Sequence, residues 1–81
     1  MRVNVVCFGA LRDYLPDTAE RNRAQLDLEA GASVSDLVRF LGAPKGLVYA
    51  LLIDGERAAL DTELRDGAEV TLMPPFTGGA A

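Results

Sequence analysis

The residues best suited to chemistry stand together near the C-terminal end, in the stretch LMPPFTGGAA. Pro74 and Pro75 prevent a preceding strand from continuing its hydrogen bonds and lead away from it as stiff, extended backbone. Gly78 and Gly79 have no side chains, so their backbone fits a narrow channel and adopts conformations closed to other residues. A terminus that only frays is the plainer interpretation. Together, the prolines, Phe76 and the glycines favour a C-terminus that is handled by the active site of another protein.

Side chains capable of catalysis are scarce in the rest of the chain. The sequence contains no histidine, and Cys7 is its only cysteine. This composition excludes a disulfide within the chain, a cysteine-rich zinc site and a four-cysteine iron–sulfur cluster supplied by the chain alone. It also excludes a Ser-His-Asp or Cys-His arrangement without a second chain. Because Cys7 stands among valines and Phe8, we expect an inert core residue rather than a redox or persulfide thiol. Tyr14 and Tyr49 are likewise expected to be packing residues.

Acidic residues are concentrated between Asp54 and Glu69. They could form a docking surface for a basic partner, or a solvated turn region, because Asp-Gly turns bring carboxylates with them. The spacing of Asp61, Glu63 and Asp66 matches no calcium-binding loop, so we expect no metal site there.

The bulk composition indicates a single small domain. The 81 residues are 49% hydrophobic and 25% charged, which is ordinary for a globular protein and far from the disordered class. The net charge of −4 argues against a nucleic-acid-binding module, whose affinity depends on neutralising phosphates. No apolar run is long enough to cross a membrane and no secretory signal is evident, so we expect a cytoplasmic protein.

Two strands are predicted in the N-terminal third. Residues 2–8 (RVNVVCF) are rich in β-branched side chains, and residues 24–31 (AQLDLEAG) alternate between apolar and polar ones. The second strand is expected to be a hairpin partner of the first, with Gly9 and the polar stretch 12–23 forming a turn and loop. Alternation assigns the residues of the first strand to two faces, with Val3, Val5 and Cys7 on one and Val6 and Phe8 on the other.

One helix is predicted over residues 33–42 (SVSDLVRFLG), where the apolar residues follow helical spacing. Ser33 and Asp36 resemble a capping box, with Asp36 in place of the usual Glu or Gln. Gly42 is suited to end the helix, and Pro44 prevents its continuation. The helix is expected to pack on the sheet through Leu37 and Leu41, against Val5, Leu26, Val70 and Leu72.

The C-terminal half predicts further strands. Residues 46–60 (GLVYALLIDGERAAL) indicate a strand, an Asp54-Gly55 turn and a short returning strand. A loop and a second turn at Asp66-Gly67 then lead to a final strand at about residues 69–73. Two strands, a helix and two or three more strands form an α+β pattern, with one helix packed across a mixed sheet.

The order and spacing of these motifs resemble the MoaD/ThiS family of sulfur carriers over nearly the whole chain. VNVVCFGALRD is similar to the family's opening strand and Phe-Ala-x-Leu-Arg segment, and EAGASVSDLVRFLG resembles its helix entry. LLIDGERAALDTELRDGAEVTLMPPFTGG resembles its last turn and strands with the terminal diglycine. The resemblance implies a ubiquitin-like β-grasp fold, a mixed sheet of four to five strands with one main helix packed across it. It also implies a domain over residues 1–75 and a flexible tail over residues 76–81.

The resemblance implies a carrier that is a substrate, not an enzyme. A ubiquitin-activating-type enzyme uses ATP to adenylate the carboxylate of Gly79, and sulfur then replaces the adenylate to give a thiocarboxylate. Gly78 gives a side-chain-free approach, and the carrier binds no cofactor or metal itself. The Pro-Pro pair favours sulfur donation for molybdopterin, inside the large subunit of molybdopterin synthase. Partner contacts are expected at Phe76 and Thr77 in the tail, at Met73 and Pro75 beside it, and at Val6 and Phe8 on the outer sheet face.

Ala80 and Ala81 depart from the family pattern, because members that are ready to react end in the diglycine. We interpret the sequence as a proform from which a metalloprotease removes these two residues, although an artefact or a lineage that has lost the chemistry would look the same. Three other functions stay open: sulfur donation to another acceptor enzyme in thiamine or cysteine synthesis, a ubiquitin-like modifier joined to lysines, and a non-covalent β-grasp interaction module.

Overall fold

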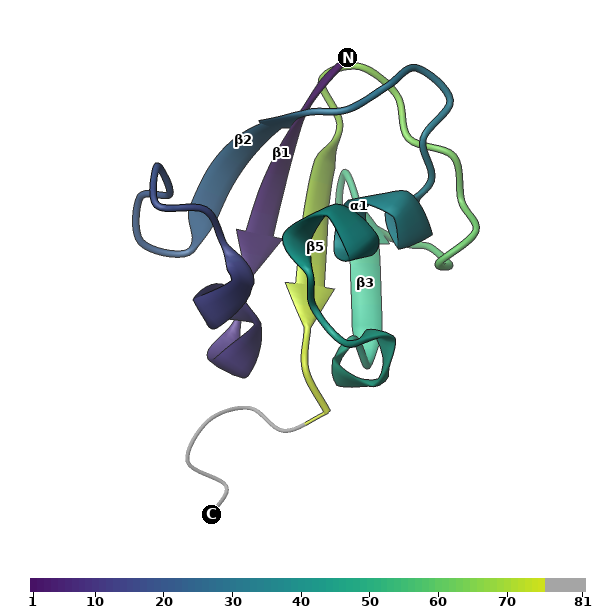
Figure 1. Ribbon diagram of the computed structural model, residues 1–81. Coiled ribbons are helices and arrows are strands. Elements are labelled where there is room, and N and C mark those ends of the chain that lie inside the picture. The colour runs from purple at the N-terminus through teal and green to yellow at the C-terminus, as the bar shows by residue number, and fades with distance from the viewer. Residues whose placement is uncertain (76–81) are drawn as a thin grey trace.

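The computed structural model describes residues 1–75, which form a mixed sheet with a helix across one face (Figure 1). The strands in this range are β1 (Arg2–Cys7), β2 (Arg23–Asp27), β3 (Ala50–Ile53), β4 (Glu56–Arg57) and β5 (Glu69–Met73). They are ordered β2-β1-β5-β3-β4, and the central pair β1–β5 is parallel while the other pairs are antiparallel. The helical segments are α1 (Val34–Leu41) and two 3-10 turns, η1 (Gly9–Tyr14) and η2 (Lys45–Leu47). The predicted α+β pattern is confirmed, and the predicted tail over residues 76–81 lies outside the described part.

The hydrophobic core lies between the sheet and α1. Val3, Val5 and Cys7 of β1 are fully buried, as the alternation in the sequence predicted, and so are Val70 and Leu72 of β5. The parallel register places Val5 beside Val70 and Cys7 beside Leu72, so the two central strands present one continuous apolar strip. This strip fixes β5 in the middle of the sheet, with a neighbour on each side.

The sequence around α1 specifies both of its ends. The N–H of Asp36 donates to Ser33 Oγ at 3.2 Å and the N–H of Ser33 donates to Asp36 Oδ2 at 2.9 Å, so the predicted capping box is present. The helix ends at Gly42, whose φ of 80° is a conformation that glycine adopts without strain. Leu37 is fully buried and Leu41 is partly buried against the core, which confirms the predicted apolar face. No helix within residues 1–75 is long and apolar enough to cross a membrane.

The predicted Asp-Gly turn joins β3 to β4. Asp54 and Gly55 have φ values of 52° and 86°, the pair of positive angles that a tight two-residue hairpin requires. The Asp54 carboxylate also accepts a hydrogen bond from the N–H of Glu69, at 3.0 Å, which ties this turn to the start of β5. The turn between β3 and β4 and the start of β5 therefore lie together at one end of the sheet.

The prediction of a turn and loop after β1 is wrong for residues 9–14, which form the 3-10 turn η1. The N–H of Leu11 donates to the carbonyl oxygen of Phe8 at 3.1 Å, and the Leu11 side chain is only 1% exposed. The buried Leu11 and the partly buried Tyr14 therefore hold this segment against the core. Two anchors are too few to establish a helical period in the sequence.

Candidate functional site

Met73, Pro74 and Pro75 are the last described residues and form the point where the C-terminal segment leaves the sheet; we call them the tail root. Met73 ends β5, Pro74 is buried, and Pro75 is exposed. The chain therefore leaves from the centre of the sheet, and its exit point is fixed by packing up to Pro74. The predicted tail contacts and reactive residues lie outside the described residues: Phe76, Thr77, Gly78 and Gly79.

Two exposed aromatic residues stand on either side of the tail root. The N–H of Phe8 donates to the carbonyl oxygen of Leu72 at 3.1 Å, and the N–H of Tyr49 donates to that of Met73 at 2.8 Å. The Phe8 side chain is 44% exposed and that of Tyr49 is 74% exposed. Phe8, which the sequence predicts as a partner contact, is thus accessible next to the tail root. Tyr49 is a second accessible aromatic residue on the other side of the tail root.

The prediction that Tyr49 is a packing residue is wrong. Tyr49 has the same parity as Leu51 and Ile53, which face the core, so alternation alone assigns it to the interior. However, β3 begins only at Ala50, and Tyr49 lies beyond the core at the end of the sheet. A signal that could have identified it is its place directly before a short strand that pairs with the end of β5. Tyr14, in contrast, is partly buried against the core, as predicted.

Positive charges flank the same end of the molecule. Arg12 lies on η1 and Lys45 on η2, both side chains are exposed, and Figure 1 shows β5 ending between these two turns. Neither cation is in an ion pair within residues 1–75, where the ion pairs join Arg2 with Asp27, Arg23 with Glu69 and Arg39 with Asp36. Aromatic residues and arginine are enriched in protein interfaces.

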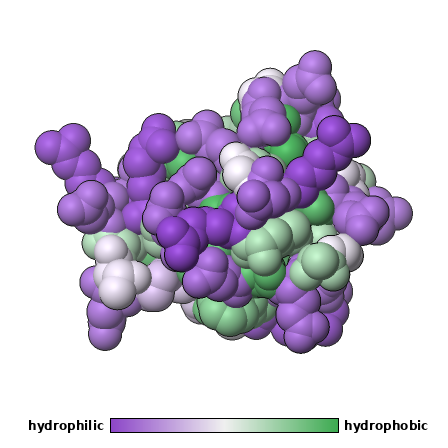
Figure 2. Space-filling model, turned by 90° about the horizontal axis from the view of Figure 1, so that it is seen from above, coloured by the Kyte–Doolittle hydropathy of each residue, from purple (hydrophilic) through white to green (hydrophobic). Residues whose placement is uncertain are grey.

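The opposite end of the molecule is acidic. Asp54 and Asp66 lie there in turns and Glu56 begins β4, because these segments join or precede the strand ends farthest from the tail root. Figure 2 views this end and shows mostly hydrophilic residues, with hydrophobic ones between them. The acidic stretch is therefore distant from the tail root, which favours a solvated turn region over a docking surface that includes the tail.

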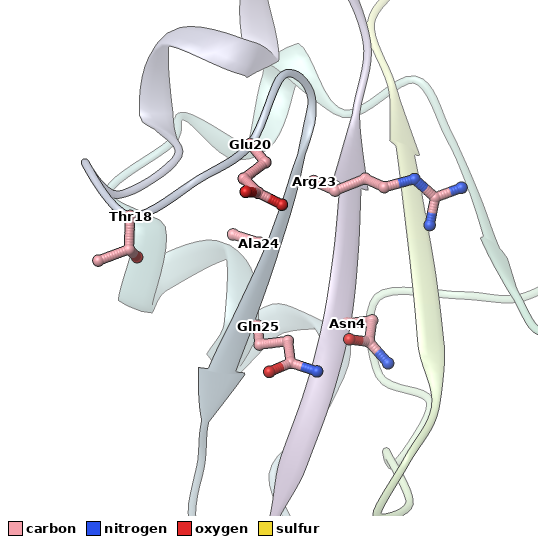
Figure 3. Close-up of a pocket in the computed structure, with 6 residues that line it drawn as sticks. All are labelled: Asn4, Thr18, Glu20, Arg23, Ala24 and Gln25. Carbon is pink, nitrogen blue, oxygen red and sulfur yellow. The ribbon is translucent and has the colours of Figure 1, made fainter.

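The outer face of the sheet is less apolar than the sequence indicated. Val6 points to this face, as predicted, but is only 5% exposed. Arg23 on β2 lies beside Val6, and Figure 3 shows its side chain crossing β1 toward β5. There its Nη1 lies 3.1 Å from Oε2 of Glu69. Because the aliphatic part of this arginine covers the strand, Val6 offers a partner little surface. The shallow hollow beside it in Figure 3 is lined by polar side chains of β2 and its neighbours.

The one thiol of the chain has no access to a reaction. Cys7 is fully buried, which confirms its predicted place in the core, and burial raises its pKa to about 11. At neutral pH it is therefore protonated and shielded, whereas a nucleophilic cysteine needs an exposed thiolate. Within residues 1–75, no three His, Cys, Asp or Glu side chains are grouped closely enough to hold a metal ion.

Comparison with known proteins places this geometry in context. The model of the family described as Mut7-C ubiquitin matches residues 1–78. SAMP1 from Haloferax volcanii is 25% identical with a TM-score of 0.69, over 98% of this chain and 100% of that one. A protein named as molybdopterin converting factor subunit 1 from Pyrococcus furiosus is 25% identical, with a TM-score of 0.68 over 93% of this chain and 98% of that one.

A third similar structure is the complex of subunits 1 and 2 of molybdopterin-converting factor from Helicobacter pylori. The match is 25% identical with a TM-score of 0.60, over 98% of this chain and 100% of that one. No curated protein matches the chain. The structural matches extend over almost the entire length of both compared chains, so they confirm the predicted ubiquitin-like β-grasp fold.

Proposed function

The chain belongs to the Mut7-C ubiquitin family and is a MoaD/ThiS-type ubiquitin-like protein, and from this premise we propose that it is a sulfur carrier. In this proposal, the carboxyl group of Gly79 is adenylated, converted to a thiocarboxylate and used to supply sulfur for molybdopterin. The protein then acts as the small, non-catalytic subunit of a larger enzyme. Its relatives named as subunit 1 of molybdopterin converting factor support this assignment.

The observation that carries the proposal is the position of the tail root. β5 ends at the centre of the sheet and Pro75 is exposed, so the four residues that follow begin at a rigid point on the surface. Four extended residues span about 13 Å, which is enough to bring Gly79 into a deep active site while the folded domain stays outside. The absence of side chains at Gly78 and Gly79 suits a narrow channel.

The chemistry requires little from the carrier except a reachable carboxylate. The Gly79 carboxylate attacks the α-phosphorus of ATP in the activating enzyme, pyrophosphate leaves, and an acyl adenylate forms. A sulfide equivalent then attacks the acyl carbon, and AMP leaves with the electron pair of the broken C–O bond, so one oxygen is exchanged for sulfur. Adenylation is needed because a carboxylate oxygen is a poor leaving group. Cys7 has no part in these steps, since it is buried and protonated.

Two partners follow from this chemistry. One is a ubiquitin-activating-type enzyme that binds ATP and provides the catalytic groups. The other is a large subunit into which the tail with its thiocarboxylate is inserted. The H. pylori complex of subunits 1 and 2 supports a partner of the second kind. Residues after Gly79 have to be absent for the reaction, because each one moves the free carboxylate about 3.5 Å further along the chain. We assign their removal to a peptidase such as a metalloprotease.

Intact-mass spectrometry tests the proposal directly. The chain ending at Gly79 is incubated with the activating enzyme from the same genome, ATP and a sulfide donor, beside the chain of 81 residues and a control that ends at Gly78. We expect exchange of one oxygen for sulfur only in the chain that ends at Gly79. Equal modification of all three would refute the role of Gly79, and modification of none would refute the carrier function.

The same assay separates the proposal from the ubiquitin-like modifier. An acyl adenylate also reacts with lysine amines, so a modifier would give higher-mass conjugates that disappear when Gly79 is deleted. A carrier gives the thiocarboxylate and passes its sulfur to a purified large subunit with the molybdopterin precursor. Sulfur delivery only to an acceptor of thiamine or cysteine synthesis would replace the molybdopterin assignment and keep the carrier.

A further inference from the structure

We propose that Tyr49 and Lys45 form a docking surface beside the tail root, and that the large subunit that receives the tail meets them with an apolar slot edged by carboxylates. This inference rests on the proposed function to the extent that the same partner takes up the tail. It adds a second contact, built from folded residues, to the insertion of the tail itself. The two residues lie on η2 and directly before β3, a segment for which the sequence predicted no role in binding.

Tyr49 has the features of an interface anchor. Its side chain is 74% exposed, the largest exposed fraction among the large hydrophobic residues described. Its backbone is nevertheless fixed, because its N–H donates to the carbonyl oxygen of Met73 at 2.8 Å. A tyrosine side chain has only two main torsions and combines a broad apolar ring with a polar hydroxyl, so its burial by a partner costs little conformational entropy. The ring is thus presented next to the tail root in a prepared position.

The turn that carries Lys45 is also rigid. The N–H of Leu47 donates to the carbonyl oxygen of Pro44, and that of Val48 to the carbonyl oxygen of Lys45, each at 3.0 Å. Leu47 and Val48 are partly buried against the core. Because the backbone is already ordered, a partner that binds here loses little affinity to ordering the turn.

The charge of Lys45 indicates what the partner presents. Lys45 is exposed and belongs to none of the ion pairs described, and Arg12 repeats this arrangement on the far side of the tail root. The protein as a whole has a net charge of −4, but η2 carries Lys45 and no acidic residue, whereas Arg12 on η1 is followed by the exposed Asp13. Charge complementarity then requires carboxylates on the partner, around the slot that takes the ring.

Phe40 and Arg65 provide matched controls on the same molecule. The Phe40 side chain is 60% exposed, but it lies on α1 beside the loop of residues 27–32, away from the tail root. Arg65 is an exposed cation in the loop before β5, at the acidic end, and makes no side-chain ion pair in the described structure. Replacing Phe40 removes an exposed aromatic ring, as replacing Tyr49 does, and reversing Arg65 changes the net charge as reversing Lys45 does, without touching the proposed surface.

Binding of the full chain to the purified activating enzyme and large subunit from the same genome tests the inference by calorimetry and stopped-flow kinetics. We expect Tyr49→Ala to raise the Kd of the complex with the large subunit by about tenfold or more, as for a buried aromatic anchor. Phe40→Ala should leave it nearly unchanged. Lys45→Glu should slow association more at low salt than Arg65→Glu, although both alter the net charge equally.

The outcomes divide clearly. An unchanged Kd for Tyr49→Ala, an equal loss for Phe40→Ala, or no binding of the unmodified chain would overturn the docking surface. Equal effects of the two charge reversals would show that net charge alone matters, and would overturn the acidic slot. Because binding needs no sulfur, a chain that docks through Tyr49 but never forms a thiocarboxylate would refute the proposed function and leave this surface standing.

Discussion

The contact between α1 and the sheet is the part of the fold whose loss should be most costly, and Leu37→Ala tests it. Leu37 is fully buried and is one of the largest side chains in the core. Truncation of a buried leucine removes apolar contacts and leaves a cavity, at a cost of about 2–5 kcal/mol. A domain of this size is stable by roughly 4–12 kcal/mol, so the change removes a large share of its stability. The melting temperature should fall by at least about 8 °C.

Phe40→Ala is the matched control, since it makes a truncation to alanine on the same helix. Phe40 is 60% exposed, so we expect its replacement to change the free energy of unfolding by no more than about 0.5 kcal/mol. Circular-dichroism melts and urea titrations of both variants measure the difference. If Leu37→Ala melts like the unmodified protein, or if both variants lose the same stability, the helix does not bury the face described here.

Three further predictions concern local features. In Asp36, the hydrogen bond from the Ser33 backbone lowers the pKa below its usual 3.8. The stabilisation that Asp36→Asn removes should therefore be present above about pH 5 and vanish as the pH falls through the lowered pKa. Urea titrations of both proteins at each pH measure this difference. In Cys7, burial raises the pKa from 9.0 to about 11, so the contribution of this group to stability should be constant below pH 9 and decrease as the pH rises from 9 to about 11. A thiol reagent should label the protein only after denaturation. Gly55→Ala should cost about 1 kcal/mol in a thermal melt, although nothing lies within 4 Å of the added methyl group, because φ at this residue is +86°.

The features that the sequence predicted well depend on neighbouring residues. The capping box of Ser33 and Asp36 and the end of the helix at Gly42 are contacts between residues three or four positions apart, or conformations of a single residue. The Asp54-Gly55 turn likewise depends on the positive φ that two adjacent residues tolerate. Such local preferences act before the chain is packed, so they can be recognised in the sequence alone.

The features that the sequence predicted poorly depend on residues far apart in the chain. Val6 is covered because Arg23 reaches Glu69 across β1, a contact over 46 positions. Tyr49 has the same alternation position as Leu51, but it is exposed because it lies before the start of β3, beyond the end of the core. Neither outcome follows from alternation, since each depends on which strands become neighbours and where they end. The candidate surface at the tail root therefore became visible only in the fold.

The topology of the sheet also explains why the acidic residues and the tail are separated. β1 and β5 run parallel, so their C-terminal ends lie at the same end of the sheet. β3 starts at this end because it is antiparallel to β5. The turn between β3 and β4 and the turn before β5 must then lie at the opposite end of the sheet. Both are Asp-Gly turns, whose carboxylates tie the turns to neighbouring strands: Asp54 accepts a hydrogen bond from the N–H of Glu69, and Asp66 accepts one from the N–H of Arg2. Carboxylates that the fold uses at its turns are thus held away from the tail root, where Phe8, Tyr49 and Lys45 lie exposed instead.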